Sequence, residues 1–469
     1  MKTPKKALVV LLILSSFSQM RAQTDAQDSL MLASFYDAVL TEGECYSNLR
    51  VLCKDIGHRL AGSESAAKAI RWGKEVLQSY NPDTVFLMDV EVPHWSRGNN
   101  EFASYTKQTG SEKMEVKVDI TALGGSVGTD GILSAKIVEV KSFDELKALG
   151  EANVKGKIVF FNKAMDAALI NTGAAYGGAY PIRGDGPSEA AKLGAVGCII
   201  RSLTLADDTY PHTGATKYQD DVTRIPAGAL SSVASRQLSA DLKSNPDLIF
   251  SMNLSCVAYE RTMQHNVIAE IRGSDFPDEY ITIGGHLDSW DIGEGAHDDG
   301  AGIVQSMEVL RALIKSGYKP RHTIRIVLFI NEEFGNDGGE TYAKVCKKQG
   351  LIHVAALESD AGGFTPMGFN AELNDHQFEV YSKWKPLLES FGLYVLRRGG
   401  SGVDIRPLKK DDNRIALFGL NVDGQRYFDY HHSNNDRFEN VNERELKLGA
   451  AAMTSLVYLL DQSGLPASE

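Results

Sequence analysis

Residues 281–302 constrain the fold of this chain more than any other stretch, because a strand, a polar loop and a helix follow one another there. The apolar run that begins at Ile281 is typical of a buried strand, and two glycines break it before His286. A Gly-rich loop then leads to Asp298, and apolar residues recur with the helical period from Ile303 onward. A strand that ends in polar side chains just before a helix is typical of an α/β sheet, in which chemistry collects at the carboxyl ends of the strands.

Three later segments repeat this arrangement. The apolar run 324–330 ends in Glu332 and Glu333, the run 354–357 leads into Asp360, and the run 415–420 is followed after a loop by His432. Strands that helices cover on both faces appear as nearly continuous apolar runs. The sequence therefore predicts an α/β protein with a three-layer, doubly wound, mostly parallel sheet.

The middle of the chain has a different character. Residues 111–255 are rich in glycine and in short β-like runs, with a single helix signal at Ser188. No cluster of titratable residues stands at the ends of these runs. His212 and Asp207 could belong to a metal site, but a solvated loop is the favoured interpretation. We predict an inserted β-rich domain at 111–255, which divides the other domain into residues 23–110 and 256–469.

The first 22 residues are typical of a secretory signal peptide. Lys2, Lys5 and Lys6 precede an apolar run that begins at Ala7 and is too short to span a bilayer, which takes about 20 residues. We therefore expect export, to the periplasm or beyond, without stable membrane insertion. The net charge of −12 argues against a nucleic-acid partner and against a polybasic membrane anchor. The five cysteines form no CxxC pair, so neither a disulfide framework nor a thiolate zinc site is predicted.

The polar residues at the predicted strand ends are suited to binding metal ions. Imidazoles and carboxylates without a thiolate suit a catalytic zinc or a similar divalent ion. Six groups are too many for one tetrahedral ion and fit two ions that share a bridging carboxylate. These groups are His286, Asp298, Glu332, Glu333, Asp360 and His432.

We assign Asp298 as the bridging residue because it lies between the first histidine and the later clusters in the chain. His286 and Asp360 would then complete one site, and Glu333 and His432 the other. Adjacent residues that leave a strand point in opposite directions, so Glu332 and Glu333 should not bind the same ion. One of them can ligate while the other acts as general base. Asp288 is placed to hold the second nitrogen of the His286 imidazole.

The chain resembles the co-catalytic zinc exopeptidase family of aminopeptidases, in the branch of the plasma glutamate carboxypeptidases and their bacterial relatives. The resemblance covers nearly all of the mature chain, and its segment KGKIVFF looks like part of a protease-associated domain. The matching motifs are GGHLDSWD, GAHDDGAG, NEE, ALESDAGG, YHHSNND, HRLAGS and PHWSRG.

The resemblance implies two Zn²⁺ per chain and a role for each site residue. It makes Glu332 the base, and it favours His432 over its neighbour His431 because His-Ser-x-x-Asp fits the late motif of the family. The implied ligands are His286, Asp298, Glu333, Asp360 and His432.

We expect an exported exopeptidase that hydrolyses dipeptides or removes amino-terminal residues from short unblocked peptides. Asp404 is one candidate for holding the substrate's amino group, although a plain surface loop is favoured there. Three alternatives are carboxypeptidase-like action, a non-catalytic binding protein and a glutaminyl-cyclase-like acyltransferase; the complete set of ligand positions argues against the last two. We expect short peptides as partners, and the sequence leaves a homodimer open.

Overall fold

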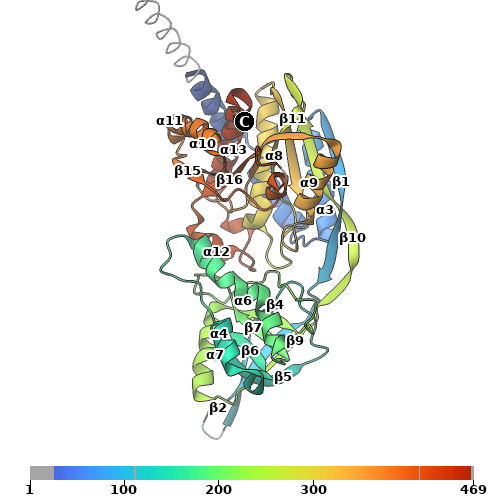
Figure 1. Cartoon of the computed structure of the whole chain (residues 1–469), viewed down its shortest axis with the longest axis vertical. Helices are drawn as coiled ribbons and strands as arrows, with labels where there is room; N and C mark the ends of the chain where they lie inside the picture. Colours follow the sequence, from blue (N-terminus) through green and yellow to red (C-terminus); the bar gives the residue numbers. More distant parts are fainter. Residues whose placement is uncertain (1–25, 110–111, 411, 466–469) are drawn as a thin grey trace, which may run out of the picture.

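The computed structural model describes residues 26–109, 112–410 and 412–465, so the predicted signal peptide at 1–22 lies outside the described residues. The described chain forms two sheets of eight strands each. They occupy opposite ends of the long axis of the molecule, with the second sheet at the bottom of Figure 1. No helix of the described residues is both long enough and apolar enough to cross a membrane.

The first sheet has the strand order β1-β10-β12-β11-β13-β16-β14-β15. Its four central strands β12, β11, β13 and β16 are parallel, as the sequence predicts. Toward one edge β10 pairs antiparallel with β12 and with β1, and toward the other edge β14 pairs antiparallel with β16 and parallel with β15. The strands are β1 (Thr84–Ser96), β10 (Val257–Ile271), β11 (Phe276–His286), β12 (His322–Phe329), β13 (Ile352–Glu358), β14 (Pro366–Glu372), β15 (Val395–Arg398) and β16 (Ala416–Val422).

Helices cover both faces of this sheet because its central strands are apolar on both sides. Along β12, Ile326 and Leu328 pack into the core cluster that includes α8 (Ala301–Lys315) and α13 (Glu443–Ser463). Val327 points to the other face and packs in a cluster with Tyr342 of α9 (Asp337–Gln349). This alternation produces the predicted three layers of helix, sheet and helix.

The remaining helices of this part connect or flank the strands. Residues 26–42 are helical, and α3 begins where the side chain of Ser63 accepts a hydrogen bond from the amide of Ala66. The others are α2 (Cys45–Val51), η1 (Leu52–Ile56), α3 (Glu64–Ser79), η2 (Ala296–Gly300), α10 (Asp375–Ser382), α11 (Lys385–Glu389), η3 (Arg406–Lys409), η4 (Gly424–Arg426), α12 (Tyr427–Tyr430) and η5 (Phe438–Asn440).

Residues 93–96 continue strand β1 although a proline stands at position 93. The ladder between β1 and β10 shifts register between Val92 and His94 and then resumes, so His94 pairs with Tyr259 and Ser96 with Val257. The length of β10 supplies partners for this extension, which a local pattern around Pro93 does not indicate.

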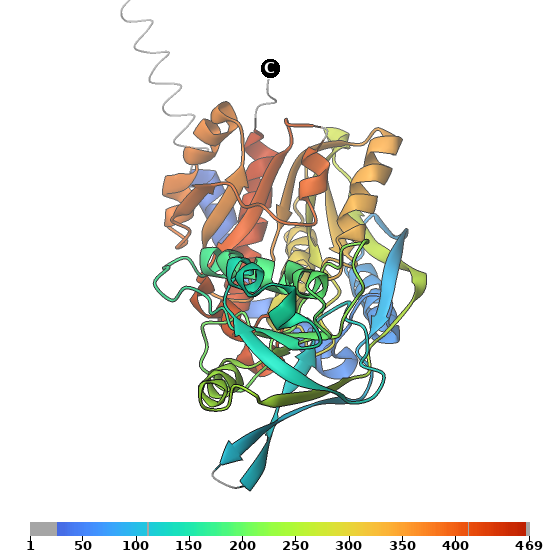
Figure 2. The same ribbon diagram turned by 60° about the horizontal axis from the view of Figure 1, so that its bottom comes forward.

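The second sheet is built from the chain between β1 and β10. Its order is β3-β2-β9-β5-β6-β7-β8-β4, and β2 and β3 extend beyond the rest of the molecule at the bottom of Figure 2. Its elements are β2 (Glu101–Thr109), β3 (Glu112–Val118), β4 (Ile120–Ala122), β5 (Leu133–Val140), α4 (Phe143–Leu149), α5 (Glu151–Val154), β6 (Ile158–Phe161), α6 (Thr172–Lys192), β7 (Gly197–Arg201), β8 (Ala227–Leu230), α7 (Ser232–Ser244) and β9 (Ile249–Leu254).

Two details of this region differ from the sequence pattern. The helix signal at Ser188 marks the end of α6, a helix of 21 residues, and not its beginning, because Pro181, Pro187 and several glycines conceal the helical period. Strand β2 already belongs to the second sheet although it precedes residue 111. The two parts of the molecule share an apolar cluster in which Met165 and Leu203 pack with Phe428.

Candidate metal centre

The carboxyl ends of three adjacent strands bring the predicted ligands together. His286 is the last residue of β11, Glu333 follows β12, and Asp360 follows β13. The register holds these ends level, since His286 lies opposite Phe329 of β12 and Gly284 opposite Glu358 of β13. Asp298 lies in η2, and His432 comes from the loop between α12 and α13.

Asp298 stands in the middle of the group, with one carboxylate oxygen toward each side. Its Oδ1 lies 3.3 Å from Nε2 of His286, and that nitrogen is 3.6 Å from Oδ1 of Asp360. Its Oδ2 lies 3.3 Å from Nε2 of His432, which is 3.0 Å from Oε2 of Glu333. The structure thus gathers all five predicted ligands into two halves around one carboxylate.

Several buried polar atoms of this cluster have no hydrogen-bond partner among the described residues. They are Nε2 of His286, Oδ2 of Asp298, Oε1 of Glu333 and Oδ1 of Asp360. Buried polar atoms in native proteins are almost always satisfied, so a group of orphans indicates a missing ligand. Zinc held at about 2.1 Å by each donor would separate tetrahedral donors by about 3.4 Å, close to the four distances above. The donors therefore fit divalent ions of the zinc type.

The electrostatics point the same way. Burial raises the pKa of Glu333 to about 7 and raises the pKa of Asp360 as well. Burial alone would lower the pKa of His432, but Glu333 and Asp298 raise it to about 9. The cluster therefore carries more negative charge than its own side chains neutralise, and bound cations would favour the ionised carboxylates.

Main-chain carbonyls orient the two imidazoles. Nδ1 of His286 lies 3.1 Å from the carbonyl oxygen of Asp288, and Nδ1 of His432 lies 3.2 Å from that of Thr213. A carbonyl can only accept, so Nδ1 of His286 carries the proton and its Nε2 is free to ligate. A terminal nitrogen of Arg183 also lies 3.2 Å from Nδ1 of His432, and Nε2 of that ring faces Asp298 and Glu333.

The carboxylate of Asp288 has a different position from the one predicted. It is 3.8 Å from Nδ1 of His286 and accepts hydrogen bonds from the amides of Asn331, Glu332 and Glu333, at 2.6, 3.1 and 3.3 Å. Asp288 therefore fixes the turn that carries the two glutamates, while its carbonyl holds the imidazole.

Glu332 lies partly exposed beside the buried Glu333. Burial, reinforced by the charges of Asp360 and Glu333, raises the pKa of Glu332 well above its usual range. A raised pKa suits a carboxylate that has to accept a proton near neutral pH.

Two residues that sequence reasoning missed hold the loop 286–298 in place. The guanidinium of Arg59 is fully buried and donates to the carbonyls of Leu287, Glu294 and Gly295. The carboxylate of Asp436 accepts from the amides of His297 and Asp298, at 2.7 and 3.1 Å. Both belong to quoted motifs, HRLAGS and YHHSNND, and that was the only signal for them.

Four sequence expectations concern other residues of the chain. His212 is buried, with Nδ1 2.7 Å from the carbonyl of His431, so the expected solvated loop is wrong there. Asp207 is exposed and pairs with Arg236, as a surface residue would. Asp404 does not lie on a surface loop, because it is fully buried. Of the predicted carboxylate ligands, His431 pairs with Asp298, at 3.7 Å, whereas His432 pairs with both Asp298 and Glu333.

The chain is similar to known peptidases over most of its length. Residues 266–457 match the model of "Peptidase family M28". The chain is 32% identical to carboxypeptidase Q of Xenopus laevis over 89% of this chain and 86% of that protein, and 31% identical to the human protein over 89% and 85%.

The fold of the chain is similar to those of solved peptidase structures. The crystal structure of a peptidase M28 precursor from Shewanella amazonensis has a TM-score of 0.88 at 32% identity and covers 95% of this chain and 99% of that chain. A zinc aminopeptidase from Bacillus subtilis shares the fold, with a TM-score of 0.62 at 18% identity over 88% and 94% of the two chains.

Proposed function

The chain belongs to peptidase family M28 and is a metallopeptidase, and from this premise we propose that it is a two-zinc exopeptidase that acts on short peptides. The observation that carries this proposal is the position of Asp298. Its two oxygens face two separate pairs, His286 with Asp360 and His432 with Glu333. A single carboxylate between two such pairs suits a bridging ligand.

In this proposal bound zinc ions supply Lewis acidity, which polarises the scissile carbonyl and acidifies a water molecule. The protein's own part begins with Glu332, whose carboxylate accepts the proton of the attacking water and returns it to the departing amine. Asp288 holds Glu332 for this task through the amides of the turn. His286 presents Nε2 because the carbonyl of Asp288 holds its Nδ1 proton, and the contacts of Nδ1 with Thr213 and Arg183 orient the ring of His432.

We propose that the substrate binds by its free amino end. Glu332 is partly exposed and is not a zinc ligand in this proposal, so its negative charge is available to attract an ammonium group. Asp404, the earlier candidate for this contact, is sealed from solvent and does not serve it.

The test is digestion of a peptide panel by the zinc-loaded protein, read by mass spectrometry. The panel pairs each dipeptide and tetrapeptide with its amino-acetylated and carboxyl-amidated forms. We expect free and amidated peptides to lose their first residue and acetylated peptides to stay intact. Equal cleavage of acetylated peptides, or release from the carboxyl end, would contradict the amino-end assignment. Release from the carboxyl end would favour the carboxypeptidase activity that the name of the relatives states.

We also propose export after removal of residues 1–22, and a protease-associated role for the second sheet in shaping access to the centre. The charge pattern of the first residues supports the export proposal. Amino-terminal sequencing of the protein recovered from the periplasm or medium of its host tests it. Recovery only from the cytoplasm, with Met1 or Lys2 as the first residue, would contradict it.

A further inference from the structure

The ligand residue His432 has a backbone conformation that needs outside support. Its φ is 61°, in the left-handed region that residues other than glycine rarely adopt. Such a conformation persists at functional sites only where surrounding contacts hold it. The contacts of His432 with the rest of the chain therefore bear on how the metal centre keeps its shape.

A segment of the second sheet's region supplies these contacts. The amide of Thr213 donates to the carbonyl of His432 at 2.8 Å, and the carbonyl of Thr213 lies 3.2 Å from Nδ1 of the same residue. Next to it, His212 pairs with Ser433 as an isolated β-bridge. One residue of the inserted part thus holds the backbone of a predicted ligand and contacts its imidazole, which a terminal nitrogen of Arg183 also contacts at 3.2 Å.

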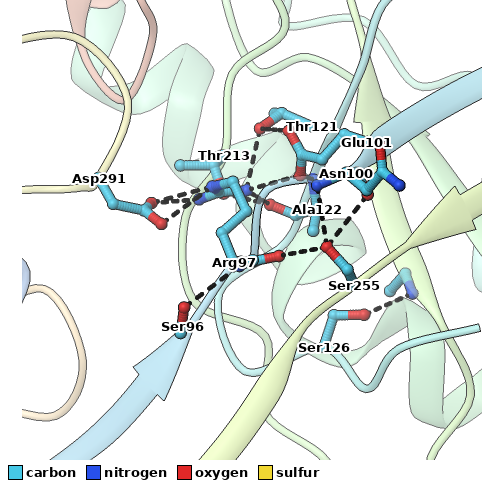
Figure 3. Close-up of polar contacts among 12 residues, drawn as sticks. Ser96, Arg97, Asn100, Glu101, Thr121, Ala122, Ser126, Thr213, Ser255 and Asp291 are labelled. Atoms are coloured by element: carbon cyan, nitrogen blue, oxygen red, sulfur yellow. Dashed lines mark hydrogen bonds and ion pairs between the residues drawn. The ribbon is translucent and has the colours of Figure 1, made fainter.

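Thr213 is in turn fixed by Arg97, as Figure 3 shows. The hydroxyl of Thr213 donates to the carbonyl of Ala122 at 2.6 Å and lies 3.4 Å from a terminal nitrogen of Arg97. The other terminal nitrogen of Arg97 donates to the same carbonyl at 2.5 Å and to the hydroxyl of Thr121 at 2.9 Å. Arg97 and Thr213 therefore share one anchor at the end of β4.

The same guanidinium contacts the loop between the ligands His286 and Asp298. Its Nε and one terminal nitrogen donate to the carboxylate of Asp291 at 3.0 and 2.5 Å, and Asp291 lies between His286 and Asp298 in the chain. Arg97 is 6% exposed, so water competes little for these bonds. The fork geometry of arginine allows it to hold both partners at once, which a lysine cannot do.

We infer that Arg97 is a positioning residue of the metal centre. By holding Asp291 on one side and Thr213 on the other, it fixes His432 relative to His286 and Asp298, and so sets the affinity of the ion on the His432 side. This inference rests on the proposed two-zinc function. It assigns the inserted part a role in holding the metal, beyond shaping access to it.

The experiment is a zinc competition titration of the metal-free full chain, with the wild type, Arg97→Lys and the control Arg325→Lys compared. Arg325 is also a buried arginine, 4% exposed, and its partners Glu270 and Tyr342 belong to β10 and α9. We call the ion on the His432 side the second zinc. We expect Arg97→Lys to lower the affinity for the second zinc about tenfold or more and the affinity for the first little, as the loss of a residue that supports a ligand does. Turnover should fall by a similar factor with KM within about twofold. Arg325→Lys should lower the melting temperature and leave both zinc affinities unchanged.

Thr213→Val serves as a second variant if Arg97→Lys does not fold, since it removes one hydroxyl and keeps the side-chain volume. We expect it to weaken the second zinc by about threefold, in proportion to its smaller loss. The inference would be overturned if the variant that folds bound both zinc ions with the affinities of the wild type. It would also be overturned if Arg325→Lys lost as much affinity for the second zinc as Arg97→Lys. Wild-type protein that binds fewer than two zinc ions would overturn the proposed function instead, so the two failures are distinguishable.

Discussion

Each end of the parallel sheet carries a buried histidine next to a buried carboxylate, His286 with Asp298 at one end and His322 with Asp461 at the other. Among the described residues, only the first pair has atoms without a hydrogen-bond partner. At the carboxyl end, Nε2 of His286 and Oδ2 of Asp298 are the buried atoms that lack a partner. At the amino end, the carboxylate of Asp461 accepts from the amides of Arg321 and His322, from Nδ1 of His322 and from the hydroxyl of Tyr318. The first arrangement needs a ligand, and the second is complete.

The difference shows which observation identifies a site. The residue types are similar at the two ends, and the size of the cavity would indicate the wrong end. A hollow of about 390 Å³ lies at the amino end, lined by Glu279, His322 and His353, whereas the space beside Asp298 and Glu333 is much smaller. Buried donors and acceptors without a partner distinguish the candidate metal centre from the amino end, where the hydrogen bonds of Asp461 connect α13 to β12.

The largest expected effect comes from Glu332→Gln, which removes the proposed base and keeps the shape of the side chain. We expect turnover on a dipeptide to fall by about 10²-fold or more, since general-base catalysis contributes about 10²–10⁴. Zinc content, measured on the same sample, should stay at the wild-type value. Glu333→Gln is the matched control and should lose zinc as well as activity. If Glu332→Gln loses zinc and Glu333→Gln retains it, the two roles are reversed.

At the other end, Asp461→Asn should change stability and not chemistry. The variant loses a buried acceptor that binds four donors, so the free energy of unfolding should fall by about 1–3 kcal/mol in urea titrations. Turnover measured well below the melting temperature should stay within about twofold of the wild type. A loss of turnover as large as that of Glu332→Gln would show that the two ends are coupled and that the comparison fails.

The pH dependence of that stability sharpens the contrast. Burial would raise the pKa of Asp461, but hydrogen bonds from His322 and Tyr318 outweigh it and hold the pKa below its usual value. In the acid range the unfolded chain therefore binds the proton more readily, so the stabilising contribution is complete above about pH 5 and is lost as pH falls below about 4. The gap in unfolding free energy between wild type and Asp461→Asn should be constant from about pH 5.5 to 8 and narrow below about 4. A gap that narrows toward alkaline pH would contradict this account.

The smallest expected effect is that of Asp207→Ala, in the inserted part. Asp207 makes an exposed ion pair with Arg236, and such pairs contribute little. Turnover and melting temperature should both stay within experimental error of the wild type. His212→Ala removes a buried contact to the carbonyl of His431, and we expect a change in turnover of less than a few-fold. A loss in Asp207→Ala larger than in His212→Ala would show that exposure is a poor guide to function here.

The sequence alone could place the five predicted ligands near strand ends because their signal is local. Four of them follow an apolar run of their own, and Asp298 follows the Gly-rich loop after the first run, so these positions could be read without knowledge of their partners. Arg97 and Thr213 could not be found this way, because their partners Asp291 and His432 lie about 200 residues further along the chain. Asp461 was missed for the same reason, and α6 because prolines and glycines break its pattern.

The central claim is that Asp298 joins two metal sites, and zinc stoichiometry tests it most directly. Metal-free wild-type protein and Asp298→Ala are titrated with zinc, and bound metal is counted by elemental analysis after removal of the excess. We predict about two zinc ions per wild-type chain and loss of both sites together in Asp298→Ala, because each half depends on one oxygen of that carboxylate. Saturation of the wild type at one zinc ion, or retention of one ion at wild-type affinity in Asp298→Ala, would contradict the claim.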